Sequence, residues 1–117
     1  MDKLTIDVRP LEDKQAFLIR ATGTIDSETT PLLEENLKHA IECGEFNIVI
    51  DLAGVDFISS SGFGLILGTV GELRANNGDL TLMAVPDTLR EMLSILGVED
   101  YFQVVTKMSE IPVKNPA

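Results

Sequence analysis

The sequence has few of the side chains from which catalytic and metal sites are built. Among its 117 residues there is one cysteine, Cys43, which can form no internal disulfide and has no second thiolate for a zinc site. There is also one histidine, His39, so a serine nucleophile would have a single possible base. We expect both on one helix, with His39 on its solvent side and Cys43 at its end in a structural role. The sequence gives no support for a metal site, and we expect no cofactor.

Positive charge is also scarce, because nine Lys and Arg against nineteen Asp and Glu give a formal net charge of −10. The positive residues form no basic stripe that could meet a phosphate backbone, which argues against direct nucleic-acid binding. The negative charge would repel anionic membranes, and no segment reaches the roughly 20 apolar residues of a spanning helix. The first residues lack the basic and apolar regions of a secretory signal, so we expect a cytoplasmic protein.

Hydrophobic residues make up 44% of the chain and are spread along it, which is typical of one domain with a single core. We expect this domain to span residues 1–117, with a core over about 3–111 and a frayed tail from Pro112. Apolar and polar residues alternate over 4–8, and a largely apolar run follows over 16–21 after a break at Pro10 and Asp13. Together they predict an opening β-hairpin that ends at Gly23. A nearly continuous β-branched run over 47–52 predicts a central strand.

The rest of the chain alternates between helical and strand patterns. Helices are predicted over 31–44, 62–76 and 86–97, strands over 80–85 and 101–105, and a last helical turn over 107–111. The apolar positions at core spacing on the three helices are Leu33, Leu37, Ala40 and Ile41, then Phe63, Ile66, Leu67, Val70 and Leu73, then Leu89, Met92, Leu93 and Leu96. The order β-β-α-β-α-β-α-β predicts an α/β fold with a mostly parallel sheet packed with helices.

Three consecutive serines, Ser59, Ser60 and Ser61, lie where a strand region gives way to the second predicted helix. One of their hydroxyls can cap the helix while another points outward. The sequence alone does not choose among them.

The same turn lacks the patterns of three enzyme classes. A hydrolase elbow needs Gly-x-Ser-x-Gly, whereas Phe57 and Ile58 precede these serines. A dinucleotide fingerprint needs its third glycine one residue earlier than Gly68, and no lysine is present for a Walker loop. The turn therefore gives little support for an enzyme of any of these three classes.

Four glycines in the second predicted helix need an explanation, because each costs roughly 1 kcal/mol relative to alanine in a helix interior. They are Gly62, Gly64, Gly68 and Gly71. We expect that they let the helix approach the sheet or a partner closely.

Residues 56–68, Asp-Phe-Ile-Ser-Ser-Ser-Gly-Phe-Gly-Leu-Ile-Leu-Gly, resemble the signature turn and helix of the STAS domain, specifically of bacterial anti-sigma-factor antagonists. Further similarity follows in family order at 23–26, 48–52, 77–78 and 96–98, so the resemblance covers nearly the whole chain. It implies the STAS fold, with its opening β-hairpin and single domain.

The resemblance also implies a phosphorylation switch. In that family, the serine two residues before the first glycine of the helix is phosphorylated by a partner serine kinase, which is also the anti-sigma factor. This position is Ser60, and Ser61 is either a competing acceptor or the structural cap of the helix. Ser59 replaces the aspartate that the family most often has there. ATP and magnesium would belong to the kinase, so the resemblance implies a binding protein that is not itself an enzyme. A separate serine phosphatase would restore Ser60.

A partner-contact surface is implied around this turn. Its expected members are Gly23, Asp26, Ser27, Ser59, Ser61, Gly62, Phe63 and Leu67. Phe63 could be an interface anchor or a core residue, and both interpretations stay open.

A second function is compatible with the same fold. The chain could be a STAS scaffold, or an accessory subunit of a transporter or a stress-signalling complex, in which the turn binds an ATPase without phosphorylation. The replacement of aspartate by Ser59 is the feature that keeps this alternative.

Overall fold

A computed structural model describes residues 3–111. The strands are β1 (Leu4–Leu11), β2 (Ala16–Ile25), β3 (Asn47–Ile58), β4 (Asp79–Met83) and β5 (Gln103–Val105). The helices are α1 (Thr30–Glu42), α2 (Ser60–Ala75) and α3 (Asp87–Leu96). Short 3-10 turns span Glu12–Lys14, Glu99–Tyr101 and Met108–Glu110. The expected order of elements is confirmed, and the tail predicted from Pro112 lies outside the described residues.

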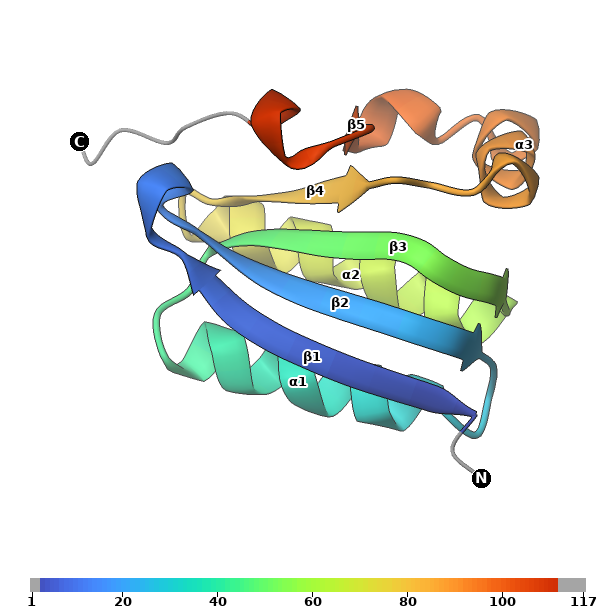
Figure 1. Ribbon diagram of the computed structural model, residues 1–117, viewed down its shortest axis with the longest axis horizontal. Coiled ribbons are helices and arrows are strands. Elements are labelled where there is room, and N and C mark those ends of the chain that lie inside the picture. Colours follow the sequence, from blue (N-terminus) through green and yellow to red (C-terminus); the bar gives the residue numbers. More distant parts are fainter. Residues whose placement is uncertain (1–2, 112–117) are drawn as a thin grey trace.

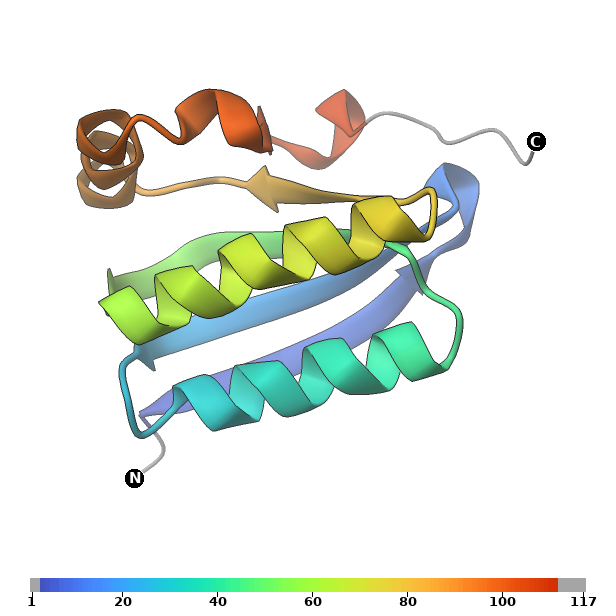
Figure 2. The ribbon, with the colours of Figure 1, turned by 180° about the vertical axis from the view of Figure 1, so that it is seen from behind.

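The strands form one sheet in the order β1-β2-β3-β4-β5. β1 and β2 are the antiparallel hairpin, and the other neighbouring strands pair in parallel. Helices α1 and α2 lie side by side on one face of the sheet, and α3 lies at one end of it (Figures 1 and 2). Because β2 and β3 are parallel, their carboxyl ends meet at the same edge of the sheet.

The main core fills the layer between the sheet and the two long helices. It contains the predicted stripe of α1 through Leu33, Leu37 and Ala40, while Ile41 is half-buried. A smaller cluster on the other face joins Leu11, Ala16, Leu18, Val49, Met83 and Ile111. The central strand β3 therefore has apolar packing on both faces, as its β-branched run predicts.

Several predicted boundaries are wrong; for example, α2 begins at Ser60 and not at Gly62, and β4 ends at Met83 and not at Val85. β2 continues past Gly23, and β3 continues to Ile58, because residues 22–25 and 54–58 pair with each other after shifts in register. Tyr101 belongs to a 3-10 turn and not to the last strand. Leu96, expected on the buried face of its helix, has 56% of its surface exposed.

Among residues 3–111, no helix combines the length and the apolar character that crossing a bilayer would require.

Candidate functional site

The serine turn lies at the sheet edge where β2 and β3 end. The Ser59 N–H donates to the Ile25 carbonyl at 2.8 Å, which joins the end of β2 to the start of α2. A Cβ at Gly62 would stand 2.7 Å from Cγ2 of Ile25 and 3.0 Å from Cγ1 of Ile58. Only glycine lets the first turn of α2 lie directly on the two strand ends. The expected close approach to the sheet is confirmed at this position.

The other three helix glycines do not have this role. A Cβ at Gly64, Gly68 or Gly71 would meet no atom of the described chain within 4 Å. The prediction that they let α2 approach the sheet is wrong, because they lie on the exposed side of the helix. Contact with a partner remains a prediction for these residues.

The three serines have different hydrogen bonds, and this difference separates their roles. Ser59 is the N-cap of α2, with its Oγ accepting from the Gly62 N–H at 3.2 Å. The hydroxyls of Ser59 and Ser61 lie 2.8 Å apart and bond to each other. Within residues 3–111, the Ser60 hydroxyl makes no hydrogen bond, and the side chain is exposed at the first residue of the helix. Among the described residues, Ser60 is thus the one of the three serines whose hydroxyl is not engaged in a hydrogen bond.

We expect Ser59→Ala to reduce the free energy of unfolding by about 1 kcal/mol, because it removes the cap of α2. Thermal unfolding followed by circular dichroism should show a melting temperature lower by about 5 °C. Ser61→Ala is the matched control, since it removes the bond between the hydroxyls but leaves the cap. An equal loss in both variants would contradict the assignment of Ser59 as the cap.

The loop after β2 is held in place by Asp26. Its Oδ1 accepts from the N–H groups of Glu28 and Thr29 at 2.9 and 3.0 Å, and Oδ2 lies 3.4 Å from the Lys3 ammonium. Desolvation acts to raise the pKa of Asp26, but the two N–H donors and Lys3 outweigh it and hold this pKa below its ordinary value. Asp26 was expected to contact a partner, and the geometry gives it this structural task as well. Its neighbour Ser27 is exposed.

The lowered pKa of Asp26 sets a pH dependence. Its ionised form stabilises the fold above the ordinary carboxyl pKa of about 3.9, and this contribution is lost as the pH falls through the lower folded value. We expect Asp26→Asn to lower the urea midpoint at pH 7, with a difference from the wild type that shrinks below about pH 4. A difference that stays constant from pH 7 down to about pH 2 would contradict this role of the charge.

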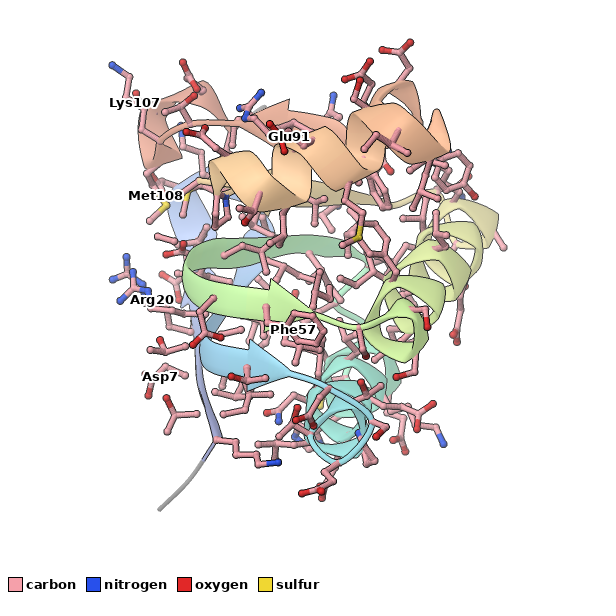
Figure 3. The ribbon with its side chains drawn as sticks, turned by 90° about the vertical axis from the view of Figure 1, so that its right-hand side faces the viewer. Asp7, Arg20, Phe57, Glu91, Lys107 and Met108 are labelled. Atoms are coloured by element: carbon pink, nitrogen blue, oxygen red, sulfur yellow. The ribbon has the colours of Figure 1, made fainter. Side chains whose placement is uncertain are left out.

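An apolar groove of about 510 Å³ adjoins the serine turn. It lies between the end of β3, the start of α2 and α3, and its lining residues are Phe57, Ile58, Ser59, Ser60, Phe63, Gly64, Leu67, Met92 and Leu96. None of these side chains is charged. Figure 3 shows Phe57 at the carboxyl end of β3, where half of its surface is exposed. Ser60 therefore stands on the rim of a hydrophobic surface.

Phe63 belongs to the main core, and only 6% of its surface is exposed. It also lines the groove, so contact of Phe63 with a partner remains a prediction. Phe57, Met92 and Leu96 are groove residues that the sequence analysis did not assign to the site. One signal for them exists in the sequence, because apolar Ile95 and Leu96 end a helix whose buried stripe already contains Leu89 and Leu93.

His39, the only histidine in the sequence, lies on α1 and not at the serine turn, where it would be needed as a base. His39 is exposed on α1, as expected, with its Nε2 3.9 Å from Sγ of Cys43 at the C-cap. Among residues 3–111, no three His, Cys, Asp or Glu side chains are grouped to hold a metal ion.

The family model of the STAS domain matches residues 8–111, which is most of the chain. The chain belongs to the STAS domain family. The Anti-sigma-B factor antagonist of Staphylococcus aureus (strain NCTC 8325 / PS 47) is 27% identical to it over 101 residues, covering 86% of this chain and 94% of the relative. The Staphylococcus epidermidis protein of that name is 26% identical with the same coverage.

Solved structures agree with this STAS fold. An anti-sigma factor antagonist from Mycobacterium paratuberculosis superposes with a TM-score of 0.81 at 22% identity, covering 92% of this chain and 90% of that one. The anti-sigma factor antagonist SpoIIAA in its unphosphorylated form gives 0.70 at 23% identity, with 91% of each chain covered. The phosphorylated form of the Bacillus protein SpoIIAA also gives 0.70, at 24% identity, with 88% and 93% covered. These likenesses confirm the STAS fold expected from the sequence.

Proposed function

We propose that this STAS domain is an anti-sigma factor antagonist. Its unphosphorylated form binds an anti-sigma factor that is a serine kinase, and this binding frees a sigma factor. Phosphorylation of Ser60 by that kinase ends the binding, and a serine phosphatase restores it. The names of the relatives support the general role, and the free hydroxyl of Ser60 on the rim of the apolar groove supports the switch.

The start of α2 can accept a phosphate without unfolding. Within residues 3–111, the backbone N–H groups of Ser60 and Ser61 donate to no other group. Free N–H groups and the helix dipole stabilise an anion at this position, and Ser60 already points outward. Phosphorylation adds about −1.5 to −2 charges there. The fold therefore survives the modification.

The same charge is incompatible with docking on the groove. The groove is lined by apolar side chains and serines, so a partner that covers it removes water from its rim. A phosphate on Ser60 would have to lose its hydration in that contact. It would also add negative charge to a chain whose net charge is already −10. Partner binding is lost through this desolvation, while the STAS domain stays folded.

The replacement of aspartate by Ser59 is compatible with this function. Ser59 supplies the helix cap through its hydroxyl, which is the structural task an aspartate at this position can also perform. Loss of the carboxylate removes one negative charge beside the acceptor Ser60.

The experiment that tests the function is phosphorylation with the captured partner. The wild-type chain is used to retain proteins from native cell extract, and retained proteins are identified by mass spectrometry. A retained anti-sigma factor is then incubated with MgATP and the purified chain. We expect one phosphate on Ser60 and none on Ser60→Ala, with Ser61→Ala labelled like the wild type.

Other outcomes would overturn parts of the proposal. Labelling of Ser60→Ala would move the acceptor to Ser59 or Ser61. Retention of a transporter ATPase or a scaffold protein, with no phosphate transfer, would replace the antagonist function by that of an accessory subunit.

A further inference from the structure

We propose that this chain pairs weakly with a second copy of itself through the free edge of β1, in an antiparallel register centred on Val8. Among residues 3–111, β1 is the first strand of the sheet and borders only β2. Figure 1 shows it along the outer edge of the sheet, above α1. Val8 is a hydrophobic residue near the middle of this strand, and 47% of its surface is exposed. An exposed edge of this kind is a template for pairing with another strand.

The hydrogen-bond pattern of the hairpin determines which backbone groups are free. The Lys3 carbonyl accepts from the Thr24 N–H at 2.8 Å, so these two residues form a hydrogen-bonded pair. Such pairs alternate along an antiparallel ladder, so the odd-numbered residues of β1 bond to β2. The N–H and C=O groups of Ile6 and Val8 therefore point to the free edge. In a register centred on Val8, the Val8 residues of the two copies would exchange two backbone hydrogen bonds.

The charges of β1 select this register over its neighbours. Asp7 and Arg9 flank Val8, and among residues 3–111 neither side chain forms an ion pair or a hydrogen bond. In a register centred on Val8, Asp7 of each copy lies directly opposite Arg9 of the other. A register centred on Asp7 would place two aspartates opposite each other, which is unfavourable. The segment Asp-Val-Arg is thus complementary to itself in one antiparallel arrangement.

The contact is small, which makes the predicted dimer weak. Pro10 has no N–H, so it can accept a bond from Ile6 of the second copy but cannot return one. Contacts limited to one strand edge fall below the area of stable interfaces, and the dimer should depend on protein concentration. Helix α3 and the start of α2, which line the groove beside Ser60, lie away from this edge (Figures 1 and 2). A dimer would leave both grooves accessible, so this inference does not rest on the proposed function.

Sedimentation equilibrium over about 10 μM to 1 mM tests the proposal. We expect a monomer–dimer equilibrium for the wild type. Asp7→Lys alone and Arg9→Glu alone should each weaken self-association at least about tenfold, because each turns two attractive cross-strand pairs into repulsive ones. An equimolar mixture of the two variants should restore dimers. In the mixed pair, the introduced lysine faces the introduced glutamate, and the native Arg9 faces the native Asp7.

Restoration by mixing separates pairing at this edge from a loss of folding, and a melting curve of each variant checks the fold. A wild-type chain that keeps the mass of one chain up to about 1 mM would overturn the proposal. Asp7, Arg9 and Pro10 would then be residues that block edge pairing, as charged residues and proline do on many edge strands. Single variants that dimerise like the wild type, or a mixture that stays monomeric, would also overturn it.

Discussion

Ser60→Asp should reduce binding of the anti-sigma factor by about 30-fold or more, because a charge left unpaired in a desolvated contact costs about 2 to 5 kcal/mol. The hydroxyl of Ser60 lies on the rim of the groove formed by β3, α2 and α3. A partner that docks on the groove removes water from the carboxylate introduced by Ser60→Asp. In the part of the chain that the structure describes, no Lys or Arg lines the groove to pair with this charge. Isothermal titration calorimetry with the captured partner measures the change.

The same substitution should leave the fold intact. An acidic residue in the first turn of a helix interacts favourably with its dipole, by about 0.3 to 1 kcal/mol at an exposed site. The melting temperature should therefore equal that of the wild type or rise by a few degrees. Ser59 retains its bond to the Gly62 N–H, so α2 keeps its cap.

Two matched variants separate charge from other effects. The side chain introduced by Ser60→Asn has nearly the same shape as that introduced by Ser60→Asp but carries no charge. This variant should therefore bind the partner almost like the wild type. Ser109→Asp adds the same charge to an exposed turn outside the groove, and it should also bind normally. Normal binding by Ser60→Asp would contradict the switch, and weak binding by Ser60→Asn would show that shape and not charge is the cause.

The order of elements could be predicted from the sequence because each pattern is local. The β-branched run of β3, the apolar stripe of α1 and the glycine that ends α3 each act within a few residues of chain. The second half of β3 could not be predicted in this way. Ala53 and Gly54 weaken the local strand signal, and residues 54–58 are held by β2 after a shift in register. That pairing depends on tertiary structure.

The candidate site was predicted only in part for the same reason. The position of Ser60 followed from the resemblance, but the choice of the cap required the actual start of α2. That helix begins at Ser60, two residues before the predicted Gly62, which makes Ser59 the cap. The groove required the position of α3 beside α2, which the connection after β4 determines. Ala84 in this connection has a positive φ of 56°. The sequence does not predict this conformation, because residues other than glycine adopt it only rarely.

Gly78→Ala is expected to have the largest effect on stability. A Cβ at Gly78 would overlap the carbonyl oxygen of Phe46 and lie 2.8 Å from the Phe46 Cβ. That carbonyl accepts from the Asp79 N–H at 3.0 Å, at the point where β4 joins β3. Since most of the obstacle is backbone, relief requires the strands to separate at their start. We expect a loss of about 3 kcal/mol or more and a melting temperature lower by about 10 to 15 °C.

Gly71→Ala is the control for Gly78→Ala, because it makes the same substitution where no atom lies within 4 Å. Alanine favours a helix interior by up to about 1 kcal/mol over glycine, so this variant should melt at a higher temperature than the wild type. Equal melting temperatures for the two variants would contradict the steric argument. The control also tests the glycines of α2, since a more stable Gly71→Ala that binds the anti-sigma factor less well would show that the partner covers this exposed side of the helix.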